Sequence, residues 1–292
     1  MMRGVISITT ATLLDGLTFG EAPRWHDGRL WYSDFFSHNV FSVQADGTGL
    51  RREMTVPGQP SGLGWLPDGR LLCVSMRDHA VVRREPTGEV SLHASLEPWV
   101  SFHANDMVVD ASGRAYVGNF GFDLEAFLAG EGAVCDTALV RVDADGSVHV
   151  AAEHLTFPNG MALAADGRTL VVAETFASRL SAFDVHPDGS LTGARVWAPL
   201  ERCAPDGICG DAKGALWVAN ARAPECRRVA EGGATLTVVE TSQPCFACAL
   251  GGDDRRTLFC MTAPTSEPRK LAGRRLGLIE VARVSVPGAG TP

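Results

Sequence analysis

Four polar residues recur at one position of a repeated motif, and their side chains are of the kind that bind hard metal ions. Counting eight residues back from the glycine of successive turns gives Asp206 in "APDGICGDAKG", Asn159 in "FPNGMALAADG" and Asn105 in "HANDMVVDASG". The first copy is one residue shorter and gives Glu21 in "FGEAPRWHDG". Carboxylate and carboxamide oxygens suit Ca²⁺, Mg²⁺ or Mn²⁺, and Zn²⁺ or Fe²⁺ where supply decides. We therefore expect one divalent ion among these residues.

The same count places two further residues in a ring with these four. They are Ser61 in "QPSGLGWLPDG" and, counted back from Asp253, Cys245 in "QPCFACALGGD". No Lys or Arg stands at any of the six positions, so converging carboxylates would be costly to bury without a cation between them. Asp and Asn also favour strand entries, where they bond to local backbone. Four such residues at one register favour a shared site instead.

The repeats predict the element that positions this ring. A turn, a glycine and an apolar strand recur as "HDGRLWYSD", "PDGRLLCVS", "ASGRAYVGN", "ADGRTLVVAE", "AKGALWVAN" and, more weakly, "DDRRTLFCMT". A second hairpin such as "VRVDADGSVHV" follows each unit, so each repeat should form a four-stranded antiparallel sheet. Six such sheets predict an all-β, six-bladed β-propeller that fills residues 1–292 as one domain, with the first strand of each blade lining a central channel. Two stacked β-sandwiches are the alternative.

A second layer of polar and aromatic residues should surround the mouth of the channel. The strand after each turn returns to the ring face and ends in Asp34, Ser75, Asn119, Glu174 or Asn220. Aromatic residues follow or precede these positions, namely Phe35, Phe36, Phe120, Phe122, Phe176, Trp99 and Phe102. This pattern predicts a small-molecule cavity with a polar floor and partly apolar walls, although each Phe could pack between blades instead. The segment 121–137, which holds the one helical pattern at 123–130, is the candidate lid.

Composition excludes several classes of partner. The chain has 292 residues, 45% of them hydrophobic, and a formal net charge of −8 without any long basic stretch, so nucleic acid is not expected. No apolar run approaches the roughly 20 residues of a membrane helix, and no signal peptide is evident, so we expect a cytoplasmic protein that is a monomer or a small homo-oligomer. The missing GxSxG pattern argues against a serine hydrolase.

The eight cysteines are expected to be buried free thiols in a reducing compartment. The sequence "CFAC" at 245–248 has the spacing of a redox or zinc half-site. Because the chain has no second CxxC, and because the pair falls on an inner strand, we expect it to be part of the core.

The motifs "GEAPRW", "HAND", "FPNG" and "PDGIC", set on six repeats, resemble the SMP-30/gluconolactonase/LRE family. The resemblance runs from Glu21 to "QPCFAC". It implies that Glu21, Asn159 and Asp206 hold one divalent metal ion, that Asp206 is also the catalytic proton acceptor and donor, and that Asn105 contacts the substrate. The implied activity is metal-dependent hydrolysis of a small-molecule lactone or related ester.

Two departures from the family pattern bear on the substrate. His103 stands where the family's sugar lactonases carry Arg, and Asp123 stands near the position of their substrate-contacting Glu. With Phe120 as a neighbouring contact, the loss of the arginine fork favours a lactone less polar than gluconolactone. His103 is either a second base or a neutral wall residue. A non-catalytic propeller that binds a metabolite or calcium, or acts as a scaffold, is the alternative, and a strictosidine-synthase-like enzyme would not need the metal residues.

Overall fold

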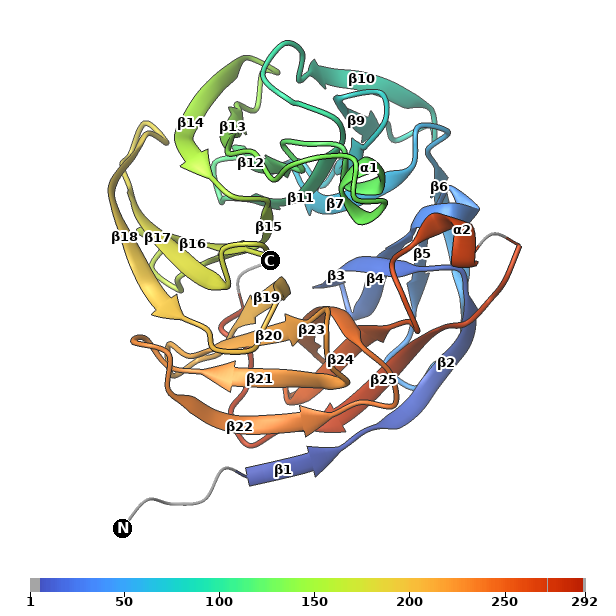
Figure 1. Ribbon diagram of the computed structural model, residues 1–292. Helices are drawn as coiled ribbons and strands as arrows, with labels where there is room; N and C mark the ends of the chain where they lie inside the picture. The colour runs from blue at the N-terminus through green and yellow to red at the C-terminus, as the bar shows by residue number, and fades with distance from the viewer. Residues whose placement is uncertain (1–5, 272, 291–292) are drawn as a thin grey trace.

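A computed structural model describes residues 6–271 and 273–290, whose strands form six sheets arranged around a central channel (Figure 1). This confirms the predicted all-β, six-bladed propeller. The four strands of each blade pair antiparallel with their neighbours, as two successive hairpins per repeat require, for example in the first blade. Among the described residues, no helix is both long enough and apolar enough to cross a membrane.

Five blades follow the order of the chain, each running outward from the channel. The first blade consists of β3 (Gly20–His26), β4 (Arg29–Asp34), β5 (Asn39–Val43) and β6 (Arg51–Thr55). The second consists of β7 (Pro60–Trp65), β8 (Leu71–Ser75), β9 (Ala80–Arg84) and β10 (Val90–Ser95). The third blade consists of β11 (Ala104–Val109), β12 (Ala115–Asn119), β13 (Thr137–Val142) and β14 (Val148–Leu155). The fourth consists of β15 (Pro158–Leu163), β16 (Thr169–Glu174), β17 (Arg179–Val185) and β18 (Leu191–Pro199). The fifth consists of β19 (Pro205–Gly210), β20 (Leu216–Asn220), β21 (Glu225–Val229) and β22 (Thr235–Glu240).

The sixth blade differs from the expectation that each repeat supplies its own four strands. It combines β23 (Cys245–Gly251), β24 (Thr257–Thr262) and β25 (Gly277–Arg283) with an N-terminal strand, β2 (Ala11–Leu17), as its outermost member. Figure 1 shows the blue strand β2 beside the red strand β25. A further strand, β1 (Ile6–Thr9), pairs parallel with β22 of the fifth blade. Pairing the two ends of the chain closes the ring of blades.

Glycines after the ring position bring neighbouring inner strands close together. A Cβ on Gly160 would lie 2.4 Å from the Asp206 carbonyl oxygen, and one on Gly207 would lie 2.7 Å from the Ala247 Cα. A Cβ on Gly62 would lie 2.3 Å from the Met107 nitrogen. Only glycine fits where two backbones approach this closely. The inner strands therefore surround a narrow channel, and the side chains beside these glycines must converge in it.

Short helices lie on the face that carries the mouth of the channel. The segment α1 (Leu124–Leu128) confirms the helical pattern within 123–130, whereas the one-turn helix α2 (Pro268–Leu271) and a 3₁₀ turn at Phe35–Ser37 were not expected. Both α1 and α2 contribute residues to the same cavity. They are thus placed to cover the end of the channel where the ring residues lie.

Candidate active site

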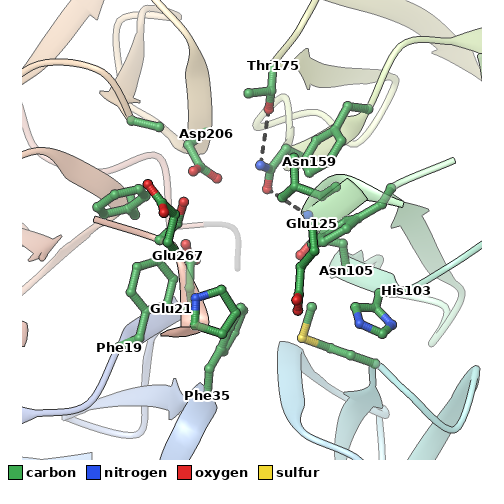
Figure 2. Close-up of a pocket in the computed structure, with 18 of the residues that line it drawn as sticks. Phe19, Glu21, Phe35, His103, Asn105, Glu125, Asn159, Thr175, Asp206 and Glu267 are labelled. Atoms are coloured by element: carbon green, nitrogen blue, oxygen red, sulfur yellow. Dashed lines mark hydrogen bonds between the residues drawn. The ribbon is translucent and has the colours of Figure 1, made fainter. Parts of the chain in front are cut away.

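Each of the first five inner strands presents its second residue to the channel. These residues are Glu21, Ser61, Asn105, Asn159 and Asp206, as the spacing predicts. A shift in strand pairing follows directly after the first residue of most of these strands, which turns the second side chain toward the axis. All five are buried, with exposed fractions of 8% or less. In Figure 2 the side chains of Glu21, Asn105, Asn159 and Asp206 point into one space.

In the sixth blade the ring position belongs to Phe246, and the prediction of Cys245 is wrong. Cys245 pairs with Thr262 at the end of the next strand, as the residue before the ring position does in the other blades. The cause is the turn, because Arg255, rather than Asp253, has the left-handed backbone conformation there (φ 55°). This repeat is therefore longer than the count assumed. The ring contains a phenyl group in place of a thiol.

A chain of hydrogen bonds fixes the two ring amides. Ser61 Oγ donates to Asn105 Oδ1 at 3.3 Å, and Asn105 Nδ2 donates to Asn159 Oδ1 at 3.1 Å. Asn159 Nδ2 in turn donates to Thr175 Oγ1 at 3.1 Å, and Thr175 Oγ1 donates to the Pro205 carbonyl at 2.8 Å. Thr175 was missed from the sequence, although it stands between two residues that the strand-end pattern selected. This chain orients both amides and leaves the Asn159 carbonyl oxygen a second lone pair.

The floor of the channel carries a buried excess of negative charge. Burial, and then the proximity of Asp206, raise the pKa of Glu21 well above its usual range. Burial, and then Asp106, raise the pKa of Asp206 in the same direction. Asp106 itself is buried and pairs with Arg24 at 3.0 Å, with exposed side-chain fractions of 6% and 7%. Three carboxylates and one guanidinium leave two uncompensated negative charges when all four groups are ionised.

This floor fits a hard divalent cation. Glu21 and Asp206 offer carboxylate oxygens and Asn159 offers an amide oxygen, which is the donor set that Ca²⁺, Mg²⁺ and Mn²⁺ prefer. An ion of charge +2 would balance the two uncompensated charges. It would also remove the cost of ionising two carboxylates in a buried site. The residues present therefore match such an ion in donor chemistry and in charge.

Above the floor lies a cavity of about 420 Å³ with largely aromatic walls. Its lining includes nine phenylalanines, Phe19, Phe35, Phe36, Phe102, Phe120, Phe127, Phe157, Phe176 and Phe246. Phe120 stacks on Phe157 with ring centroids 4.5 Å apart, and Phe157 meets Phe176 edge-on at 5.2 Å. Four further charged side chains line the cavity, namely Arg77, Glu125, Arg222 and Glu267. The site thus combines a charged floor with an apolar wall.

Not every aromatic residue selected from the sequence lies in this wall. Phe35, Phe36, Phe102, Phe120 and Phe176 do, so packing between blades is not their main role. Phe122 is buried behind the wall and packs edge-on against Phe176 at 5.3 Å. Trp99 is 38% exposed and is not part of the lining.

His103 lies in the wall, whereas Asp123 does not. Burial, and then Arg77, lower the pKa of His103, so the ring is neutral near pH 7. It stacks on Phe102 with centroids 4.1 Å apart, and its Nδ1 lies 3.1 Å from the Phe102 carbonyl oxygen. The expectation that Asp123 faces the substrate is corrected, because its exposed carboxylate caps α1 by accepting from the Ala126 amide at 2.9 Å. Glu125, on the first turn of α1, lines the cavity in its place.

The polar strand ends serve the loops and are not part of the cavity. None of them is among the lining residues, although Asp34, Ser75, Asn119, Glu174 and Asn220 are all buried. Each pairs with the residue before the ring member, so its side chain is directed away from the axis. Asp34 accepts from the Phe19 amide at 2.8 Å, and Glu174 accepts from the Thr156 amide at 2.9 Å. They hold the loops that carry the aromatic wall.

Comparison with known proteins agrees with this architecture. A family model described as SMP-30/gluconolactonase/LRE-like region matches residues 19–264. Regucalcin of Danio rerio is 26% identical over 258 residues, which cover 84% of this chain and 82% of that protein. A 6-deoxy-6-sulfogluconolactonase of Pseudomonas putida is 28% identical over 284 residues, which cover 94% of each chain.

The fold has a close counterpart among solved structures. The crystal structure of a calcium-binding protein, regucalcin, from Agrobacterium tumefaciens matches this chain with a TM-score of 0.82 at 21% identity. The match covers 100% of this chain and 99% of the other. Because the family model spans most of the sequence and its motifs lie on the channel floor, this chain belongs to the SMP-30/gluconolactonase/LRE-like family.

Proposed function

We propose that this protein is a metal-dependent lactonase that opens a lactone or related ester at the base of the phenylalanine-lined cavity. The observation that carries the proposal is the buried pair Glu21 and Asp206, whose uncompensated charge meets the Asn159 amide at the cavity floor. A scaffold propeller has no need of such a pair, since burying it without a cation is unfavourable. The reaction class is supported by the lactonase named among the relatives.

Glu21, Asn159 and Asp206 would hold the ion. A divalent cation bound there would supply Lewis-acid polarisation of the lactone carbonyl and would lower the pKa of adjacent water. The calcium-binding protein that shares the fold supports Ca²⁺ as one candidate beside Mg²⁺, Mn²⁺, Zn²⁺ and Fe²⁺.

The side chains of the floor have distinct tasks in this reaction. The Asp206 carboxylate takes a proton from the attacking water and returns it to the alkoxide oxygen released from the ring. Asn105 is held by Ser61 and Asn159 through one N–H and one lone pair of its amide. The remaining N–H and lone pair are available to orient the substrate.

The wall favours a substrate less polar than a sugar lactone. His103 is neutral and held against Phe102, so it offers at most one acceptor nitrogen where an arginine would offer a planar fork of donors. The phenylalanines instead provide a surface for an alkyl or aromatic substituent. Each methylene transferred from water to such a surface gains about 0.8 kcal/mol, or roughly fourfold in binding. We therefore expect kcat/KM to rise with the length of an alkyl substituent on the lactone.

The test combines metal analysis with a panel of lactones. Purified protein should contain about one divalent ion per chain that a chelator removes, should lose activity on chelation, and should recover it with one metal. Alkyl-substituted γ- or δ-lactones should outcompete gluconolactone. Asp206→Asn should abolish both activity and the ion that the chelator removes, whereas Asp15→Asn, an exposed change on the outermost strand β2, should affect neither. Normal lactone hydrolysis by Asp206→Asn would end the mechanism, and a clear preference for gluconolactone would end the substrate assignment.

A further inference from the structure

A cluster of thiols lies between the fifth and sixth blades, apart from the channel floor. The Sγ atoms of Cys226 on β21, Cys245 on β23 and Cys260 on β24 lie within 4.8 Å of one another. Nearby, Cys248 Sγ lies 3.7 Å from Cys209 Sγ and donates to the Gly207 carbonyl at 3.6 Å. All five are free thiols, and four of them are at most 2% exposed.

The spacing of the three central sulfurs approaches that of a thiolate metal site. Bonds from zinc to sulfur measure about 2.3 Å, so sulfurs around a tetrahedral or trigonal ion lie roughly 3.8 to 4.0 Å apart. Sulfurs already within 4.8 Å need only small side-chain adjustments to reach this separation. A disulfide would bring two of them to about 2.0 Å and would leave the third unpaired.

We propose that Cys226, Cys245 and Cys260 bind one thiophilic metal ion, Zn²⁺ or Cu⁺, through their three thiolates. Thiolates select such soft ions, whereas the oxygen donors of the channel select hard ones. Each thiol that becomes a ligand releases its proton to solvent when the ion binds. The protein then has two metal sites of different chemistry.

The expectation that "CFAC" belongs only to the hydrophobic core rested on the absence of a second CxxC motif. In the fold, single cysteines from other strands lie beside this motif instead. Cys226 comes from the fifth blade, whereas Cys245, Cys248 and Cys260 come from the sixth. An ion shared by Cys226, Cys245 and Cys260 would join two adjacent blades. The ion would therefore be structural, since the described cavity lining includes none of these cysteines.

The first measurement is the metal content of protein produced in zinc-supplemented and in copper-supplemented medium, after EDTA treatment of the folded protein. We expect about one zinc or one copper per chain to survive, and X-ray absorption at the metal edge to show a shell of sulfur atoms. The medium that yields the bound ion identifies the metal. Wild-type protein without either metal, including after reductive refolding with Zn²⁺ or Cu⁺, would overturn the proposal, as would a shell of oxygen or nitrogen atoms.

Variants separate metal binding from packing. Cys226→Ala should lose the ion that survives EDTA, and in an Asp206→Asn background its Tm should become independent of added zinc or copper. Cys73→Ala removes an equally buried thiol from the second blade. It should therefore leave a similar cavity in the core and lose similar packing, but it should keep the ion. Asp206→Asn should also keep it, which distinguishes this site from the channel floor. Retention by Cys226→Ala would refute the assignment, and the absorption spectrum of the wild type decides the matter if that variant does not fold.

Discussion

Asp206→Asn should change stability in opposite directions with and without the channel ion. The substitution preserves the size of the side chain and removes one of the two negative charges that the Arg24–Asp106 pair leaves uncompensated. In chelated protein this change relieves the repulsion from Glu21. Two unit charges about 4 to 6 Å apart repel by roughly 3 to 4 kcal/mol at an effective dielectric constant near 20. That figure is the largest stabilisation expected of chelated Asp206→Asn over chelated wild type.

The pH dependence of this difference follows from the direction of the pKa shifts. The folded-state pKa values of Glu21 and Asp206 are both raised, so the folded protein retains protons that the unfolded chain has released. The contribution of these two groups to the stability of chelated wild type is therefore fully present below their unfolded pKa values of about 4, and it is lost as the pH rises through the folded pKa values. Chelated Asp206→Asn should lose less stability over the same pH range, so its stability advantage over chelated wild type should grow with pH.

Added metal should reverse the order of the two proteins. An ion at about 100 times its Kd stabilises the folded state by about 2.7 kcal/mol. At roughly 2 to 4 °C per kcal/mol for a chain of this size, the Tm of wild type should rise by about 5 to 10 °C. Asp206→Asn has lost one of two carboxylate ligands and should gain little at the same metal concentration.

Thermal melts in acidic and in mildly alkaline buffer, each with chelator and with metal, measure all four states. Asp15→Asn is the matched control, because it removes an exposed carboxylate from the outermost strand of the sixth blade and should follow wild type throughout. The reasoning would be refuted if chelated Asp206→Asn were no more stable than chelated wild type at alkaline pH. Equal stabilisation of both proteins by metal would refute the ligand assignment.

Three further changes test the wall and the support of the floor. Thr175→Val should weaken metal binding by about 5- to 30-fold in calorimetric titration, because losing the hydrogen bond to Asn159 costs about 1 to 2 kcal/mol. Thr175→Ser keeps a hydroxyl and should bind metal as wild type does. Equal metal affinity of the two variants would exclude a role of the Thr175 hydroxyl in holding Asn159. His103→Arg should raise kcat/KM for a sugar lactone relative to an alkyl lactone, and a fall would contradict the substrate argument. Phe120→Ala should reduce kcat/KM for a long-chain lactone at least roughly tenfold, or about 1.4 kcal/mol. The kcat/KM for an unsubstituted lactone should fall less. An equal fall of kcat/KM for both lactones would point to a folding defect.

The sequence sufficed to predict the propeller and four polar ring residues, because each ring residue stands at a nearly constant distance along the chain from the turn that follows it. In each repeat a turn glycine fixes the start of the second strand, so the residue eight positions earlier falls at the channel end of the inner strand. Asn105, Asn159 and Asp206 follow this rule, and Glu21 follows it with a shorter turn. Their convergence depends only on the propeller symmetry.

The strand ends and the wall could not be predicted with the same certainty, because they depend on pairing and on loops. A shift of one residue turns a side chain to the opposite direction, so Asp34 and Glu174 anchor loops when the offset alone placed them at the site. Phe19 and Phe157 line the cavity from loop positions outside the repeated unit. Both stand two residues before a ring position, and Gln59, His103 and Ala204 line the cavity at the same offset. The offset therefore predicts the position in the wall, whereas the residue type at it varies from blade to blade.

The longer turn of the sixth blade accounts for the separation of the two proposed metal sites. With Arg255 in the left-handed position, Phe246 faces the channel and packs edge-on against Phe19, with centroids 4.8 Å apart. One sector of the floor is therefore apolar, and it offers a contact for the alkyl substituent of the proposed lactone. The same shift directs Cys245 away from the channel and into the thiol cluster. Soft sulfur donors are thereby kept apart from hard oxygen donors, and each set can select its own ion.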